Sequence, residues 1–312
     1  MVTLDLKNNK LSVLTDEIFV LQNLKLLDIS NNDFQSLPPE LGIMKNLSRI
    51  QVEGNPLRSI RMGIRTGGTN KLKKYLATKI DPNAVRKAPA GDDSEFSKIK
   101  QDMVKEEFLG GKNQKDVWAT LIREFKEANG TLILRNKDLK EITEGILTAG
   151  SISRLDISDN KIAELPPYLY KLDPAVFKMS NNLLREIPAS FHLFRNLREI
   201  ELQGNKISSF MDNLSPSECR ALHENFIGVY HLDLSQNLLT QPPECLYLFQ
   251  NLRMLTLSYN RITQIEDLFR KEGELETLEI VDFGNNKIWE IPRQIYKWQR
   301  VHSLNFENND IK

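Results

Sequence analysis

Apolar and polar positions follow one recurring pattern of eleven residues along most of this chain. In LKLLDISNNDF (24–34), apolar residues stand at positions 1, 4, 6 and 11, and an asparagine stands at position 9. Sustained repetition of this kind predicts an array of equal structural units. Ten segments fit the pattern with conservative replacements, and they begin at residues 1, 24, 47, 152, 174, 197, 229, 252, 278 and 301. Their position-9 asparagines are Asn9, Asn32, Asn55, Asn160, Asn182, Asn205, Asn237, Asn260, Asn286 and Asn309.

The spacing of these asparagines indicates what each unit looks like. Most neighbours are 22 or 23 residues apart. The x-L-x-L-x part of each unit predicts a short strand whose two apolar side chains point inward at a period of two. Successive strands would pair in parallel, about 4.8 Å apart. The asparagine side chain has two donors and one acceptor site, so we expect it to satisfy backbone groups of neighbouring turns and to have a structural role.

A second pattern fills the space between the strands. Segments such as LPPELGIMKNL (37–47) and IPRQIYKWQRV (291–301) begin with proline and continue with apolar residues at helical spacing. Proline fixes φ and ends the turn after the strand. We therefore predict a short helix or 3-10 turn on the convex side of each unit. Cys245 lies in an apolar position of such a segment, and we expect it to be a buried small hydrophobe.

One unit carries an insertion. Asn205 and Asn237 are 32 residues apart, and the extra length includes SPSECRALHENF (215–226). Ser215 with Glu218 forms a capping box, which predicts a full α-helix. This helix could simply cover the array, or it could be a convex docking site.

The pattern stops after Leu57. In RSIRMGIRTGGTNKLKKYLATKI (58–80), two glycines precede an amphipathic helix in which Leu72 and Leu76 share one face. We expect this loop and helix to close the first array, because an open solenoid end would expose its core. Its positive side chains form what we call the basic elbow: Arg58, Arg61, Arg65, Lys71, Lys73, Lys74 and Lys79.

The pattern resumes only after a polar stretch. Residues 81–113 have the composition of a linker, in which a short helix is predicted to begin at Ser94. QKDVWATLIREFKEANG (114–130) predicts a helix over 114–129 that covers the start of a second array. The array restarts at TLILRNKDL, where Lys137 replaces the asparagine. The predicted domains are a first array of three repeats (1–57), a basic loop-helix cap with a polar linker (58–113), and a cap helix with the second array (114–312).

The repeated motif resembles that of the intracellular leucine-rich-repeat proteins. The resemblance implies an α/β solenoid with short parallel strands on a concave face and short helices or 3-10 turns on a convex face, interrupted here by a helical insert. More narrowly, EGNPLRSIRMGIRTGGTNKLKKYLATKI (53–80) resembles the loop and helix that close an array in leucine-rich repeat-containing protein forty. That family has a second array after this segment. The chain starts on a strand without a preceding cap and ends just past a strand motif, so we expect a fragment at both ends.

Charge and cysteine content limit the classes of partner and the cellular compartments that we expect. Lys plus Arg and Asp plus Glu both number 42, so net charge gives no argument for nucleic acid or membrane. No apolar run approaches the ~18 residues of a membrane span, and no secretory signal is present at the start. The two isolated cysteines suggest a reducing compartment. A cytoplasmic, non-secreted protein is expected, with cytoskeletal, ciliary and nuclear locations left open.

The sequence offers little chemistry for catalysis. FLGGKN (108–113) lacks the first glycine and the final Ser or Thr of a phosphate-binding loop. His231 and His302 are separated by three repeat steps, roughly 14 Å, which is too far to share a metal ion. We therefore predict no catalytic residues, no cofactor and no metal site, and a protein that is not an enzyme.

The candidate binding residues lie on the concave side of the strands. The residue between the two inward positions of each strand points there, and this column is mainly acidic. Some of these aspartates are simply typical of the repeat. The alternative is a surface for a basic or mixed-charge protein segment, with nucleic acid disfavoured. The candidates are Arg154, Asp156, Lys178, Glu199, Glu201, His231, Asp233, Thr256, Asp282 and Asn305.

Two functions are predicted, the first mainly from the concave surface and the second from the basic elbow and the polar linker 81–113. The first is a non-enzymatic scaffold or adaptor that binds a protein on its concave face, while the basic elbow contacts an acidic surface. The second is a structural component of a large cytoskeletal or ciliary, microtubule-associated assembly.

Overall fold

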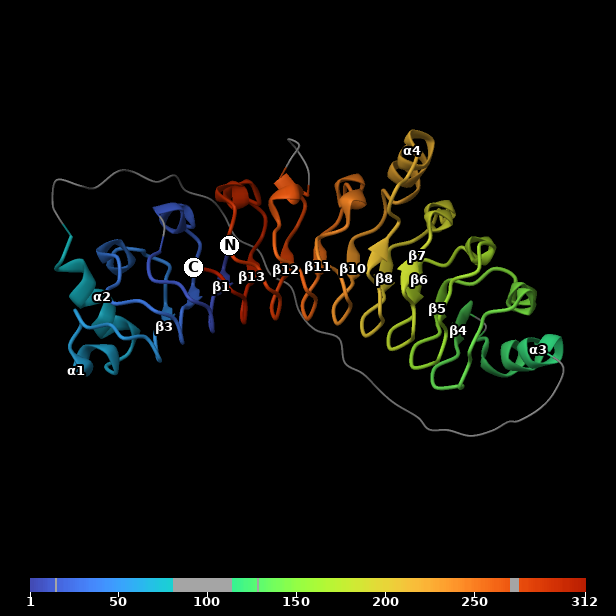
Figure 1. Cartoon of the computed structure of the whole chain (residues 1–312), viewed down its shortest axis with the longest axis horizontal. Coiled ribbons are helices and arrows are strands. Elements are labelled where there is room, and N and C mark those ends of the chain that lie inside the picture. Colours follow the sequence, from blue (N-terminus) through green and yellow to red (C-terminus); the bar gives the residue numbers. More distant parts are fainter. Residues whose placement is uncertain (15, 81–113, 128, 270–274) are drawn as a thin grey trace.

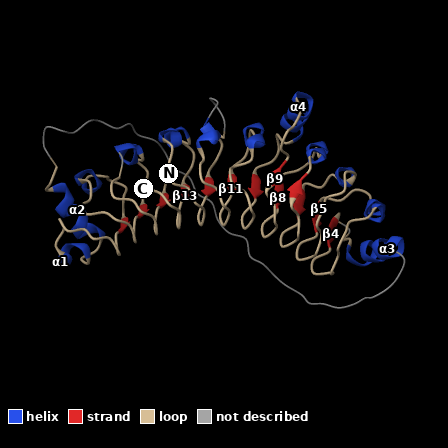
Figure 2. Ribbon diagram, viewed as in Figure 1, coloured by secondary structure: helices blue, strands red, loops and turns tan. Residues whose placement is uncertain are grey.

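A computed structural model describes residues 1–14, 16–80, 114–127, 129–269 and 275–312. The short helix predicted to begin at Ser94 lies outside these residues. The described residues form a curved array of coils, each with one strand and one convex segment (Figure 1). This is the leucine-rich-repeat solenoid that the sequence predicts, with its strands and helices on separate layers (Figure 2).

Eleven strands of three residues each form one parallel sheet. The side chain of the central residue of each strand points into the core and is buried. The side chains of its two neighbours point to the concave face, as a period of two requires. The strands are β1 Thr3–Asp5, β2 Leu26–Asp28, β3 Arg49–Gln51, β4 Thr131–Ile133, β5 Arg154–Asp156, β6 Val176–Lys178, β8 Glu199–Glu201, β10 His231–Asp233, β11 Met254–Thr256, β12 Ile280–Asp282 and β13 Ser303–Asn305.

The order of strands in space differs from their order in the chain. The sheet runs β3-β2-β1-β13-β12-β11-β10-β8-β6-β5-β4. The two chain ends therefore lie side by side within the array, three strands from its β3 end (Figure 1). We call the junction between β1 and β13 the seam. The sequence divides the chain into two arrays separated by 58–113, and the structure places the strands of both in a single sheet.

The convex segments of the described residues are 3-10 helices of four to six residues, and four of them directly follow a proline. They span Asp16–Val20, Pro39–Gly42, Glu144–Ala149, Leu169–Leu172, Ala189–Leu193, Glu244–Leu248, Glu266–Phe269 and Arg293–Lys297. Cys245 is buried in one of them, as predicted. A feature that the sequence did not predict is a second, two-stranded parallel sheet formed by β7 Glu186–Ile187 and β9 Ser209–Phe210.

Four α-helices complete the part of the fold that the structure describes. They are α1 Met62–Arg65, α2 Thr69–Ala77, α3 Gln114–Phe125 and α4 Pro216–Asn225. The predicted capping box of α4 is confirmed, since Ser215 Oγ accepts from Glu218 N at 3.3 Å and Ser215 N donates to Glu218 Oε2 at 2.8 Å. Helix α3 was predicted to reach residue 129 but ends at Phe125. The chain turns there because Lys126 forms an antiparallel bridge with Leu132.

Helices α2 and α3 lie at opposite ends of the array (Figure 1). Helix α2 packs so closely on the segment 39–42 that a Cβ atom at Gly42 would lie 2.4 Å from Ala77 N. Helix α3 packs on Glu144–Ala149, where the Trp118 side chain approaches Gly145. Both contacts cover core side chains that the terminal strands would otherwise expose.

The ten asparagines form a buried ladder along the array. Asn205 is typical: its Nδ2 donates to the carbonyls of Leu202 (2.9 Å) and Met179 (3.0 Å), and its Oδ1 accepts from Leu184 N (3.1 Å). Each asparagine therefore joins its own coil to a neighbouring coil of the array. These bonds satisfy buried backbone groups where the chain leaves each strand.

Candidate protein-binding surface

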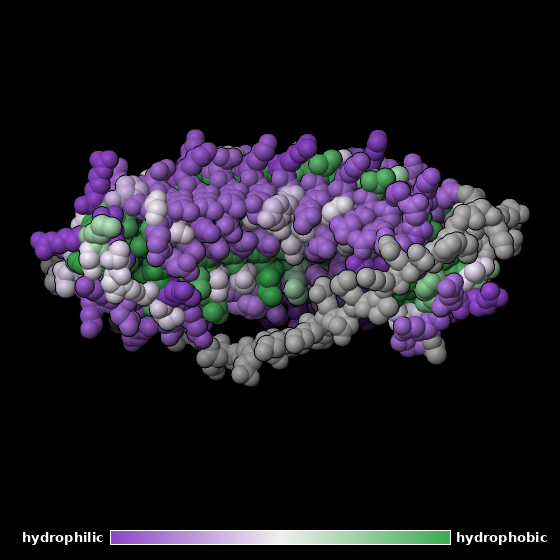
Figure 3. Space-filling model, turned by 90° about the horizontal axis from the view of Figure 1, so that it is seen from below, coloured by the Kyte–Doolittle hydropathy of each residue, from purple (hydrophilic) through white to green (hydrophobic). Residues whose placement is uncertain are grey.

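The concave face is built from the first and third residues of each strand. Because β1 follows β13 in the sheet, residues of both predicted arrays contribute to one surface. In spatial order the third-residue column runs Gln51, Asp28, Asp5, Asn305, Asp282, Thr256, Asp233, Glu201, Lys178, Asp156 and Ile133. The surface seen from below Figure 1 is mostly hydrophilic, with smaller hydrophobic patches (Figure 3).

The aspartates of this column are held by their own turns. Asp233 Oδ1 accepts from Ser235 N at 2.8 Å and from Ser235 Oγ at 2.7 Å. Asp282 Oδ1 accepts from Gly284 N at 2.9 Å, and also from the side chain of Asn305 at 2.9 Å. These are short-range turns in which an Asp side chain caps the backbone two residues on. The acidic column is therefore partly structural, and its oxygens are fixed in place.

Asp156 is the extreme case among the candidate residues. It is only 4% exposed, and its Oδ1 accepts from Ser158 N at 3.1 Å. The other candidates are all half-buried: Arg154, Lys178, Glu199, Glu201, His231, Asp233, Thr256, Asp282 and Asn305. A partner on this face would therefore meet the side chains around Asp156 more readily than Asp156 itself.

Lys178 and Glu201 form an ion pair across neighbouring strands. Their side chains are 18% and 21% exposed, and Lys178 Nζ donates to Glu201 Oε1. The pair lies on β6 and β8, which are in register. It is shielded from water more than a typical surface pair, so the two charges partly cancel in this part of the face.

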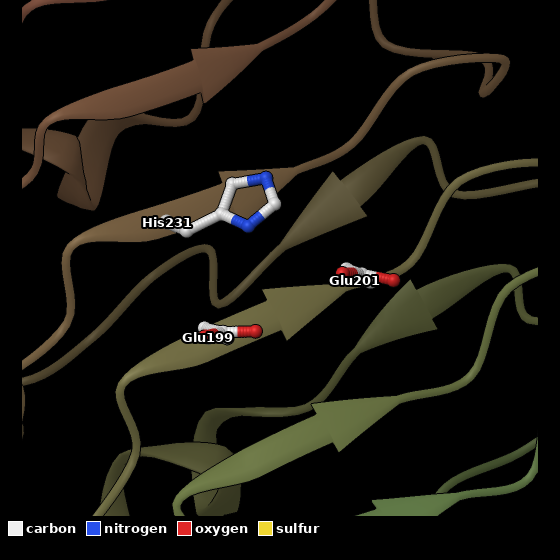
Figure 4. A group of neighbouring side chains, drawn as sticks. All are labelled: Glu199, Glu201 and His231. Carbon is white, nitrogen blue, oxygen red and sulfur yellow. The ribbon is translucent and has the colours of Figure 1, made fainter. Parts of the chain in front are cut away.

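Glu201 of this pair also lies close to Glu199 and His231 (Figure 4). Each offers an atom within 4.8 Å of the others. Glu199 and His231 are in-register partners on β8 and β10, and Glu201 is two residues along β8. All three residues were predicted on the concave face, but not as a group. The signal was present: an E-x-E strand followed by a strand that begins with histidine.

Both glutamates of this cluster already have partners. Lys178 Nζ donates a hydrogen bond to Glu201, and the Tyr230 hydroxyl donates one to Glu199. Burial, followed by the bond to Glu199, raises the pKa of Tyr230 to about 12. Two carboxylates and an imidazole are ligands that zinc accepts. The Lys178 ammonium competes for Glu201, however, and we describe the cluster as a polar centre of the concave face.

Apolar side chains lie beside this polar centre. Met254 and Ile280 are half-buried first residues of β11 and β12 and are in-register partners. They follow His231 along the same column of the sheet. An apolar strip next to fixed acidic groups is the combination that protein interfaces use for contact and orientation.

The basic elbow divides into structural and exposed members. Lys73 Nζ donates to the carbonyls of Met44 and Leu47, both at 2.7 Å, and burial lowers its pKa. Arg65 Nη1 donates to Pro56 O at 3.3 Å. These two residues fasten the cap to the last coil. The remaining members, Arg58, Arg61, Lys71, Lys74 and Lys79, are exposed.

Comparison with known proteins agrees with the fold. Residues 1–61 match the family model described as leucine rich repeat. Human leucine-rich repeats and immunoglobulin-like domains protein 3 is 27% identical over 165 residues, which covers 52% of this chain and 14% of that protein. Human podocan-like protein 1 is 33% identical over 119 residues, which covers 37% of this chain and 21% of that protein. The chain thus spans about a fifth or less of the length of these relatives.

One of the solved structures that the comparison matched to this chain is a leucine-rich-repeat protein of Leptospira interrogans. It is 20% identical with a TM-score of 0.47, and the match covers all of this chain and 68% of that one. An internalin of Listeria monocytogenes is 17% identical with a TM-score of 0.46, over all of this chain and 82% of that one. Among the described residues, no helix is both long and apolar enough to cross a membrane.

Proposed function

We propose that this chain is a non-enzymatic protein-interaction module that binds a segment of a partner protein along its concave face. The observation that carries the proposal is the continuous eleven-stranded face, whose carboxylates accept hydrogen bonds from neighbouring groups. Pre-organised groups lose little conformational freedom on binding, which favours affinity. Proteins with leucine-rich repeats generally mediate protein–protein interaction, and in this proposal the module uses its concave face.

The charge of the face sets the expected partner. Glu199, Asp233 and Asp282 bring negative charge to its centre, whereas Lys178 already neutralises Glu201. A segment with basic residues would pair with these carboxylates, and its apolar side chains would cover Met254 and Ile280. Such a segment has a basic or mixed charge, as expected from the sequence.

The exposed part of the basic elbow is the second proposed contact. Arg58, Arg61, Lys71, Lys74 and Lys79 lie on one cap, at the end of the array near β3. An acidic protein surface would bind there. The same segment, residues 53–80, supports the narrower proposal of kinship with leucine-rich repeat-containing protein forty.

A fixed structural role in a cytoskeletal or ciliary assembly would be the other use of this elbow. That hypothesis drew on the polar segment 81–113, which lies outside the described residues. No feature of the described residues favours it over the interaction module, so the module is the function that we propose.

Selection from a random peptide library tests the proposal. The concave variant carries Glu199→Gln, Glu201→Gln, Asp233→Asn and Asp282→Asn, which remove charge but keep an acceptor oxygen for each turn. The control carries Glu224→Gln and Glu244→Gln, both exposed on the convex side. The wild type and the control should enrich the same peptides, rich in Lys and Arg, and the concave variant should not. Equal enrichment by all three proteins would reject the concave face as the binding site.

A further inference from the structure

The polar centre of the concave face has the side chains of a metal site. Glu199, Glu201 and His231 each offer one ligand atom, and these atoms lie within 4.8 Å of one another. Figure 4 shows the three side chains on one side of two neighbouring strands. A metal ion about 2.1 Å from each donor in tetrahedral geometry holds its donors about 3.4 Å apart. The three atoms therefore need to approach one another by at most about 1.4 Å, which small side-chain rotations provide.

The sheet holds the backbone of these residues at a suitable spacing. Glu199 and His231 are in-register partners on β8 and β10, so their Cα atoms are about 4.8 Å apart. Glu201 lies two residues further along β8, on the same face, at a distance of about 6.6 Å from Glu199. Both strands are paired on both sides, β8 with β6 and β10 with β11. The donors thus stand on a rigid support, which is what a precise metal site needs.

Each of the three side chains keeps a free ligand atom. The bonds from Tyr230 and Lys178 go to the Oε1 atoms of Glu199 and Glu201. In the part of the chain that the structure describes, neither Oε2 atom accepts a hydrogen bond, and the imidazole ring of His231 has no hydrogen-bond partner. A metal ion could therefore bind both carboxylates and the imidazole without breaking an existing bond.

Tyr230 and Lys178 fit the role of outer partners. Carboxylates that bind metal ions generally accept a hydrogen bond from a further group, which fixes their orientation. The Lys178 ammonium also repels a cation. Three carboxylates outweigh it, because Asp233 is the in-register partner of Glu201 and adds its charge to those of the two glutamates. The local charge therefore favours a cation in spite of Lys178.

The types of ligand atom select the class of metal. One imidazole nitrogen with two carboxylate oxygens is a set that zinc accepts, and three protein ligands leave the fourth tetrahedral position open. Calcium requires six to eight oxygen ligands, and magnesium retains most of its water. A flat strand face that offers two carboxylates and a nitrogen suits neither of these ions.

We propose that Glu199, Glu201 and His231 bind one zinc ion on the concave face. Within the described ranges, no other group of three such side chains comes this close together. The fourth position of the ion faces the concave side, where water completes the coordination. The absence of a metal site was predicted by comparing His231 with His302, three repeats away, whereas these ligands come from adjacent strands.

Calorimetric titration of the metal-free protein with zinc chloride tests the site. All proteins carry Cys219→Ser, because the half-buried thiol of Cys219 is an alternative zinc ligand. The parent should bind one zinc ion per chain. His231→Ala and Glu199→Gln should each weaken binding by about tenfold or more. The control His302→Ala removes an exposed imidazole elsewhere and should leave the Kd unchanged. Calcium chloride should give no heat of binding.

Histidine ring resonances in NMR spectra of the parent give a second readout that needs no altered ligand. Addition of zinc should shift the resonances of His231 and leave those of His192, His223 and His302 in place.

Two results would overturn the proposal. In the first, the parent binds no zinc at concentrations up to about 1 mM. In the second, zinc binds with the same Kd in His231→Ala, or shifts the resonances of a different histidine, so the ion lies elsewhere. Neither measurement uses a peptide, so the metal site and the proposed partner binding can fail independently of each other.

Discussion

Asn9 and Phe306 stand 297 positions apart, yet Asn9 Nδ2 donates to Phe306 O at 3.0 Å. The return bond is also present, because Ile311 N donates to Asn9 Oδ1 at 3.3 Å. The same pair of bonds joins Asn205 to Met179 and Leu184 within the array. The first asparagine of the ladder thus bonds to the last coil, and the sheet is continuous where β1 pairs with β13.

The ladder predicts a large effect of a single buried asparagine. Asn237→Ala removes the donors to Leu202 O and Leu234 O and the acceptor of Ile207 N. A mutation that leaves a buried backbone group without its hydrogen-bond partner lowers the free energy of unfolding by about 1–3 kcal/mol per group. We expect the free energy of unfolding in urea to fall by roughly 3 kcal/mol. Lys206→Ala, at an exposed position, should change it by less than about 0.5 kcal/mol. A similar small change for Asn237→Ala would contradict the ladder.

The cap at the β3 end predicts opposite effects at two glycines. A Cβ at Gly42 would lie 2.4 Å from Ala77 N and 2.8 Å from Lys73 O, so Gly42→Ala must push α2 away. Such overpacking costs about 1–3 kcal/mol. Gly63 is helical with no atom near its Cβ, and Gly63→Ala should be neutral or stabilising by up to about 1 kcal/mol. Hydrogen exchange at Leu72 and Leu76 measures both, and equal exchange in the two variants would contradict this packing of α2.

Tyr230 predicts an unusual titration. Burial, and then the bond to Glu199, raises its pKa to about 12, against an ordinary value of 10.0. The folded state therefore prefers the neutral phenol. The resulting stability is fully present below pH 10 and is lost as the pH rises toward 12. At pH 11, carbon-13 NMR of labelled tyrosine should show a protonated resonance that Tyr230→Phe removes. In Glu199→Gln this resonance should titrate closer to pH 10. A Tyr230 resonance that titrates at pH 10 in the wild type would contradict the assigned bond.

Asp5 predicts how the seam responds to pH. Burial is the largest cause that raises its pKa, and Asp28 and Glu307 raise it further, while the backbone bond from Lys7 opposes them. The raised value means that protonation favours the folded state, so this aspartate costs stability above its folded pKa and the cost disappears as the pH falls through that value. Asp5→Asn keeps the acceptor for Lys7 N and removes the charge.

The expected result for Asp5→Asn is a higher urea midpoint than the wild type at pH 7, with the difference shrinking toward pH 4. Asp33→Asn, at an exposed position of a neighbouring coil, removes a charge away from the seam and is the matched control. A urea midpoint at pH 7 that is lower in Asp5→Asn than in the wild type would mean that the carboxylate stabilises the folded state. That result would contradict this prediction.

The sequence predicted the local structure well because each local element has its own pattern. Alternation of apolar residues predicted the strands, proline followed by apolar residues predicted the 3-10 helices, and Ser215 with Glu218 predicted the start of α4. The order of strands could not be predicted in this way. Every coil presents the same kind of edge, so nothing local in Leu4 or Leu304 shows that the two strands pair.

The sequence predicted which residues lie on the concave face. It did not predict their burial or their hydrogen-bond partners. The period of two placed Asp156 and Asp233 in one column, but it could not show that Asp156 is buried. Nor could it show which carboxylates are engaged, because the bonds of Glu199 and Glu201 come from residues on other coils, Tyr230 and Lys178. Those contacts depend on the relative position of three strands.

The most direct test of the central claim is a calorimetric titration with the peptide that the wild type selects most strongly. The wild type and the Glu224→Gln/Glu244→Gln control should bind it with the same Kd. The variant with Glu199→Gln, Glu201→Gln, Asp233→Asn and Asp282→Asn should bind it at least tenfold more weakly. An unchanged Kd for that variant, with its fold intact by circular dichroism, would contradict the claim that the concave face binds the partner.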